Sequence, residues 1–126
     1  MILKAHGPTG FRIYDPSGRS KLEIGSTDIL RSTARVFRIA GSATVNLNLT
    51  MAGELKLCRL TRAVAQRGAR LHRQQEIAIA IDGHVYAHPR IDYRTAPNGV
   101  CGSPTIEFVG QNLHAAQKLV RLIRGS

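Results

Sequence analysis

The stretch Glu76-Ile-Ala-Ile-Ala-Ile-Asp-Gly-His-Val-Tyr-Ala-His-Pro-Arg-Ile91 decides the fold of this chain. Ile77, Ile79 and Ile81 alternate with alanines, which is the period-two pattern of a strand with one buried face. Asp82-Gly83 follows at once, and this pair favours a type I′ turn because both residues tolerate positive φ. A second apolar run then returns, and Pro89 ends it. The stretch therefore predicts a β-hairpin with Asp82 and Gly83 as its structural turn.

Upstream of the hairpin, the sequence predicts a strand followed by a long helix. Residues 43–49 alternate apolar and polar side chains, as a half-buried strand does. Thr50 is placed to cap a helix whose apolar residues recur at helical spacing as far as Val64. Gly53 on that face would let the helix approach the sheet closely, and Gly68 is placed to end the helix.

The two ends of the chain complete the predicted fold. Short strands are expected at residues 11–15, 21–24 and 34–39, with a brief helical turn near residues 26–30. After the hairpin comes a loop at residues 92–103, which is expected to be mobile or functional. A strand is expected at residues 104–109, and a second helix after Asn112. The buried stripe predicted for that helix consists of Leu113, Ala116, Leu119, Val120 and Ile123.

These elements predict an α+β fold in a single domain. Residues 1–10 are expected to be a flexible segment, because Gly7-Pro8-Thr9-Gly10 has the composition of a turn. Residues 11–126 are expected to form a two-layer sandwich in which two helices pack on one face of an antiparallel or mixed sheet. At 126 residues the chain is long enough to bury a core.

Composition narrows the classes of partner. The chain has no apolar run long enough to span a membrane and no segment shaped like a signal peptide, so it is either cytosolic or cut from a longer exported protein. Its net charge of +10 points to nucleic acid, anionic lipid or an acidic protein as partner. The charge is dispersed, however, and the basic residues between Arg59 and Arg73 are interpreted first as a solvated face. Aromatic residues for base stacking are few.

No pattern of catalytic, cofactor-binding or metal-binding residues emerges, so an enzyme is not expected. His84 and His88 share a strand face by parity, which gives only a weak indication of a surface metal site. Cys58 and Cys101 have no metal-binding spacing and are interpreted first as two free thiols. A disulfide would require a fold that brings them together and an oxidising compartment.

The residues that define the fold also carry a family resemblance. The stretch Ala78–Ile91 resembles the corresponding hairpin of SecD, a subunit of the preprotein translocase. Residues before and after it resemble that family in order and spacing, namely Tyr14–Gly18, Leu22–Gly25, Thr27–Ile29, Val45–Thr50, Gly53, Leu57, Thr61, Thr105–Phe108, Leu113, Ala116, Leu119 and Ile123–Gly125. The long loop at residues 92–103 departs from the family's short glycine-rich link. The composition, rich in alanine and arginine, suggests an actinobacterial source.

The resemblance implies the head subdomain of SecD's first extracytoplasmic domain, which contacts preprotein. The function expected is therefore a non-enzymatic module for protein translocation that binds unfolded preprotein or another polypeptide. SecF and the translocon would be partners in a longer chain. The location would be extracytoplasmic in a SecD protein and cytoplasmic for a stand-alone domain. The expected contact residues are His84, Tyr86, His88, Arg90, Tyr93 and Arg94. The alternative is a basic, free-standing domain that binds nucleic acid or an acidic protein.

Overall fold

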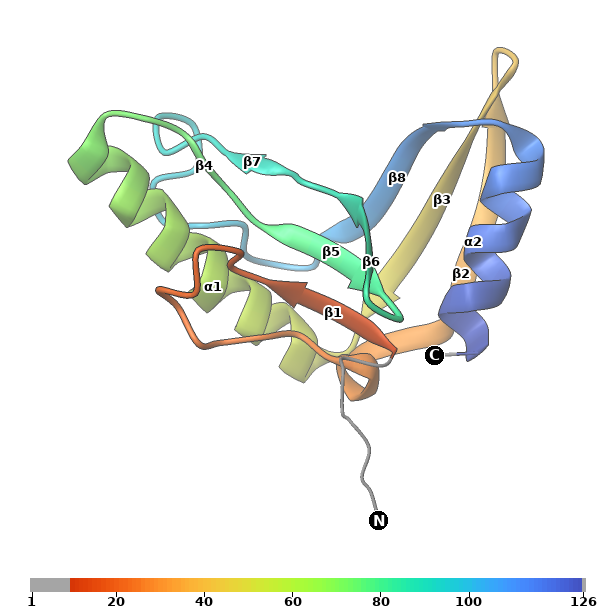
Figure 1. The fold of residues 1–126 in the computed structure, drawn as a ribbon, viewed down its shortest axis with the longest axis horizontal. Helices are drawn as coiled ribbons and strands as arrows, with labels where there is room; N and C mark the ends of the chain where they lie inside the picture. Colours follow the sequence, from red (N-terminus) through yellow and green to blue (C-terminus); the bar gives the residue numbers. More distant parts are fainter. Residues whose placement is uncertain (1–9, 126) are drawn as a thin grey trace.

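A computed structural model describes residues 10–125, and the segment expected to be flexible therefore lies almost wholly outside the described residues. Figure 1 shows how the helices lie against antiparallel strands of very different length. In chain order the elements are β1 (Phe11–Tyr14), η1 (Ser26–Asp28), β2 (Ile29–Ile39), β3 (Ser42–Leu49), α1 (Met51–Leu71), β4 (Gln75–Glu76), β5 (Ala78–Ile81), β6 (His84–Ala87), β7 (Arg90–Ile91), β8 (Thr105–Gln111) and α2 (Leu113–Gly125).

The predicted hairpin is confirmed and forms the middle of the first sheet. Strands β5 and β6 pair antiparallel, and Asp82 and Gly83 have φ values of 51° and 84°, as a type I′ turn requires. Strand β1 pairs with the other side of β5, which gives the order β1-β5-β6. Both faces of β5 are buried rather than one, because Ala78 and Ala80 lie opposite the larger side chains of Tyr14 and Arg12.

The remaining strands form two further antiparallel sheets. The second sheet has the order β2-β3-β8, and β4 pairs with β7 as a two-stranded extension of the hairpin. In β3 the alternation holds as predicted, with Val45, Leu47 and Leu49 buried in the core. The expected strand at residues 21–24 is reduced to one bridge between Ile24 and Ile13. Strand β2 begins at Ile29, directly after a 3-10 turn, rather than at residue 34.

Helix α1 begins as predicted and ends later than predicted. The Thr50 hydroxyl oxygen accepts a hydrogen bond from the Gly53 amide at 3.0 Å. A Cβ at Gly53 would collide with the Asp28 carbonyl oxygen, so this glycine permits a close approach to η1. Gly68 does not end the helix, because it lies buried against the Arg73 carbonyl and the Tyr93 ring. The helix ends at His72, whose left-handed conformation caps it.

Helix α2 is capped and buried much as its sequence predicts. The Asn112 side chain accepts a hydrogen bond from the Ala115 amide at 2.8 Å. Ala116, Leu119 and Ile123 are fully buried, whereas Val120 is half-buried and Leu113 is exposed. Helix α2 contacts β2 and β3, and α1 contacts β3, β4 and β7, so one core joins both helices to the sheets. The predicted α+β class is confirmed.

Arg67 and Asp15 form a buried ion pair within this fold. The Arg67 guanidinium contacts the Asp15 carboxylate at 2.7 and 3.2 Å, and both residues are buried. Burial alone would raise the pKa of Asp15, but hydrogen bonds from Arg67, Ser17 and Ser20 outweigh it and hold this pKa well below its usual value. The pair ties α1 to the turn that follows β1.

Candidate functional site

Strand β6 is an exposed edge of the first sheet. Within residues 10–125 it pairs with β5 alone, so the backbone groups along its other edge have no strand partner. Val85 and Tyr86 stay 42% and 40% exposed, although both are large and apolar. An exposed edge with apolar side chains is a template for pairing with another chain, unless the fold protects it.

A β-bulge shapes this edge. Ala87 lies opposite Ile79 and Val85 lies opposite Ala80, so Tyr86 is an extra residue with no directly opposite partner. A bulge bends a strand and turns its side chains to new directions. The extra residue also switches the face of the sheet to which the side chains after Tyr86 point. His84 and His88 were expected to share one face because they are four positions apart, and this expectation is wrong.

A hollow lies between β6 and α2, and we call it the β6–α2 groove. Its volume is about 570 Å³, and its lining consists of Ile81, Asp82, His84, Val85, Tyr86, Lys118 and Leu122. Apolar side chains come from both sides of the groove, and Lys118 adds a cation from α2. The Asp82 carboxylate is already engaged, because it accepts a hydrogen bond from the Gly10 amide at 2.7 Å. The groove can therefore take apolar side chains and a carboxylate from a bound segment.

The six expected contact residues separate into three groups. His84 and Tyr86 share the β6–α2 groove. His88 lies 3.4 Å from the Glu76 carboxylate, and Arg90 lines a polar hollow of about 520 Å³ beside β4. The last two, Tyr93 and Arg94, lie near the end of α1, where Tyr93 packs against Gly68 and Arg94 pairs with Asp92 at 3.1 Å. Only the first group borders both the β6 edge and α2.

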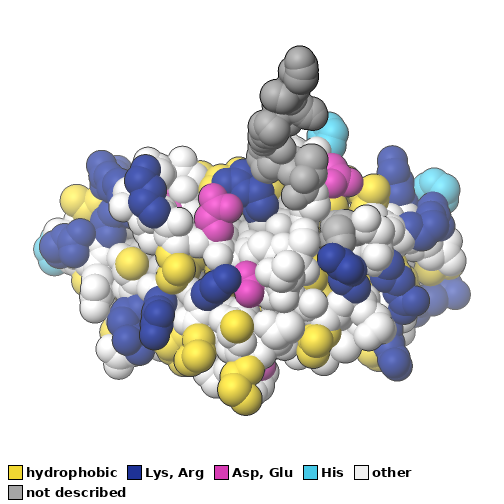
Figure 2. Space-filling model, turned by 90° about the horizontal axis from the view of Figure 1, so that it is seen from below, with side chains coloured by type: hydrophobic (Ala, Val, Ile, Leu, Met, Phe, Trp, Pro, Cys, Tyr) yellow, Lys and Arg dark blue, Asp and Glu magenta, His cyan; other side chains and the backbone are white. Residues whose placement is uncertain are grey.

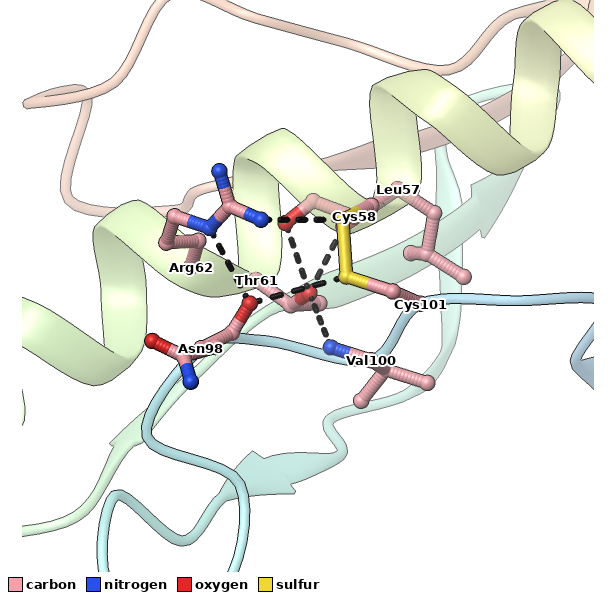
Figure 3. Close-up of a disulfide and its surroundings, with 7 residues drawn as sticks. All are labelled: Leu57, Cys58, Thr61, Arg62, Asn98, Val100 and Cys101. Carbon is pink, nitrogen blue, oxygen red and sulfur yellow. Dashed lines mark hydrogen bonds between the residues drawn. A yellow bond between two sulfur atoms is a disulfide. The ribbon is translucent and has the colours of Figure 1, made fainter.

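The loop expected to be mobile is fastened to α1 by a disulfide (Figure 3). Cys58 and Cys101 are bonded, with their Cα atoms 4.6 Å apart, so the interpretation as two free thiols is wrong. The fold brings together two residues that are 43 positions apart in sequence. Their separation hid this contact, because the loop and the helix meet only in the folded chain.

Hydrogen bonds around the disulfide hold the same loop (Figure 3). The Val100 amide donates to the Thr61 hydroxyl oxygen at 2.7 Å, and Arg62 donates to the Asn98 carbonyl at 3.1 Å. Gly99 has a φ of 90° and lies against the helix backbone, where a Cβ would come within 2.6 Å of the Arg62 nitrogen. Cys58, Thr61 and Arg62 thus form one anchor on α1, which we call the loop anchor.

Sequence reasoning missed several of these features. Lys118 and Leu122 lie in the helix predicted after Asn112, and no local pattern in the sequence links them to β6. A further hollow of about 210 Å³, lined mostly by apolar side chains, lies between the hairpin, α1 and the start of β8. Among residues 10–125, no three His, Cys, Asp or Glu side chains are close enough together to hold a metal ion.

Comparison with known proteins identifies the fold. No protein-family model and no curated protein matches the chain. A solved structure described as a membrane component SecDF that enhances protein export matches with a TM-score of 0.60 and 17% sequence identity. The match covers 93% of this chain and 61% of that structure's chain. The chain therefore has a SecD-like fold, and at this identity the likeness concerns the fold alone.

Proposed function

We propose that this domain is a non-enzymatic module of a protein-export system, equivalent to the SecD head, that binds extended polypeptide segments. Its client would be unfolded preprotein, and SecF and the translocon would be its partners within a longer chain. The observation that carries the proposal is the unpaired edge of β6 beside the β6–α2 groove. The SecD-like fold supports it, because the similar solved structure is described as enhancing protein export.

The binding mode would be addition of a client strand to β6. Backbone hydrogen bonds supply affinity in this mode, and they depend little on client sequence, which suits a module that meets many clients. Val85, Tyr86 and Leu122 offer apolar contacts to the client side chains, and Lys118 attracts carboxylates. The arrangement needs no reacting group, so the proposed activity is binding only.

The disulfide supports an extracytoplasmic location. Disulfides persist in oxidising compartments and are rare where glutathione and thioredoxin keep thiols reduced. The bond between Cys58 and Cys101 therefore suits the outer side of the cell membrane. Within residues 10–125, neither helix is long and apolar enough to cross a membrane.

The test is a titration of fluorescently labelled, unfolded, signal-bearing polypeptide into the full chain at low salt, followed by anisotropy. Saturable binding is expected, and a scrambled sequence of the same composition should bind about as well. A peptide methylated at alternate backbone nitrogens should lose binding. It keeps its side chains, but it cannot donate the backbone hydrogen bonds that pair it with β6. No saturation, or equal binding of the methylated peptide, would count against strand addition.

A pair of substitutions locates the site. Tyr86→Ser should weaken binding about tenfold, since it removes roughly 1.4 kcal/mol of apolar contact. Phe37→Ser is the matched control, because Phe37 is a similarly exposed aromatic residue on β2, which is also an edge strand. Equal effects of the two substitutions would exclude the β6–α2 groove as the binding site.

A further inference from the structure

The outward face of α1 carries arginines that the proposed polypeptide site does not use. Arg59, Arg62 and Arg70 are exposed and recur at helical spacing, so they follow one side of the helix over about 16 Å. Arg19 approaches the same side from the turn after β1. We call these four residues the arginine stripe. The face of the molecule seen from below displays many more basic than acidic side chains (Figure 2).

The arginine stripe lacks internal neutralisation. Among the described residues, Arg19, Arg59 and Arg70 form no ion pair with a carboxylate, whereas the nearby Arg67 is neutralised by Asp15. The one acidic residue of α1 is Glu54, which lies in the first turn, away from the arginines. Clustered cations without counter-charges create a positive potential that attracts anions.

A shallow hollow lies at the end of the stripe. It has a volume of about 210 Å³ and is lined by Arg19, Ser20, Ala63, Gln66, Arg67 and Arg70. Two free guanidinium groups, a hydroxyl and an amide can all donate hydrogen bonds into it. Guanidinium groups are particularly suited to phosphate oxygens, because they can donate two parallel hydrogen bonds. The chemistry of the hollow therefore fits a phosphate group.

We propose that the outward face of α1 docks on an anionic phospholipid surface, with a headgroup phosphate held between Arg19 and Arg70. At the other end of the same face, Met51 and Leu55 are 79% and 57% exposed. Leu55 lies one turn before Arg59, so its side chain points to the same side. A helix with apolar residues beside arginines on its exposed face can lie along a membrane interface, with the apolar residues entering the acyl boundary.

Charge and chemistry favour lipid over nucleic acid as the polyanion. Helix α1 contains no aromatic residue, so it offers no stacking surface for unpaired bases. Exposed Met51 and Leu55 gain nothing from a phosphodiester backbone but can enter a bilayer. The disulfide between α1 and the loop at residues 92–103 suits an oxidising compartment, such as the outer side of a cell membrane.

The experiment is co-sedimentation of the full chain with vesicles of phosphatidylglycerol and phosphatidylcholine, compared with phosphatidylcholine alone. Binding is expected only to the anionic vesicles and should fall with added salt. Arg19→Gln combined with Arg70→Gln should lower the partition constant about 25-fold, given about fivefold for each basic residue at such a surface. Leu55→Ser should weaken binding further without changing its salt dependence.

The matched control removes the same charge elsewhere. Arg31→Gln combined with Arg38→Gln takes two exposed arginines from β2 and should change the partition constant by less than about threefold. Thermal unfolding checks that both double variants remain folded. Equal losses in the two variants would show a diffuse charge effect and overturn the proposal, as would absence of vesicle binding. Duplex DNA bound as tightly as the vesicles, with the same loss in the stripe variant, would overturn the lipid assignment.

Discussion

Removing the disulfide between Cys58 and Cys101 should cost this domain a large part of its stability. The bond closes a loop between residues 43 positions apart, and the loss of unfolded-chain entropy from such a loop corresponds to about 4 kcal/mol. The total free energy of unfolding of a domain of this size is only about 5–15 kcal/mol. For 126 residues, the same change lowers Tm by about 15 °C.

The assay is urea unfolding followed by circular dichroism, with and without an excess of reductant. The variant carrying both Cys58→Ser and Cys101→Ser should match the reduced wild type and be insensitive to reductant. Alkylation followed by mass measurement reports whether the oxidised chain has free thiols. Two free thiols in the folded, oxidised protein, or a stability difference below about 1 kcal/mol, would refute the reasoning.

Three further predictions concern single contacts. Gly53→Ala should lower the unfolding free energy by about 1–3 kcal/mol in urea titrations, because its Cβ collides with the Asp28 carbonyl; an unchanged value would contradict this close approach. The free energy of unfolding should fall as the pH drops below about 4, because the depressed pKa of Asp15 stabilises the fold only while its carboxyl is ionised. In unfolding experiments across the same pH range, Asp15→Asn should lose less of this free energy at acid pH than the wild type does. Thr61→Val should speed amide exchange at Val100 with the disulfide intact, since it removes the 2.7 Å bond, and unaltered exchange would show that the disulfide alone holds the loop.

Local sequence patterns predicted most of the fold. The Asp82-Gly83 turn was recognisable because its conformation depends on two adjacent residues. The helix caps at Thr50 and Asn112 were recognisable because each depends on only three or four neighbouring residues. The end of α1 was misplaced because Gly68 serves close packing against Tyr93, a contact set by tertiary structure. Division of the expected sheet into three smaller ones likewise depends on pairing between distant strands.

The candidate site was predicted only in part. His84 and Tyr86 were identified because an apolar hairpin return stands out in sequence, but their neighbours on α2 are about 35 residues away and carry no local signal. The bulge at Tyr86 was not visible either, since it concerns which residues face one another across β5 and β6. Tyr93 also packs against Gly68 and the core, and its place in the loop sequence does not indicate that contact.

The loop anchor also has a mechanical consequence. A pulling force applied at the two ends of the domain would bypass the covalent ring between Cys58 and Cys101, because the load would pass through the sulfur–sulfur bond. The enclosed 43-residue span would hold back roughly 150 Å of contour length that reduction would release. Under such a load the oxidised domain would yield by a shorter extension than the reduced domain, and optical-trap recordings can measure that difference directly.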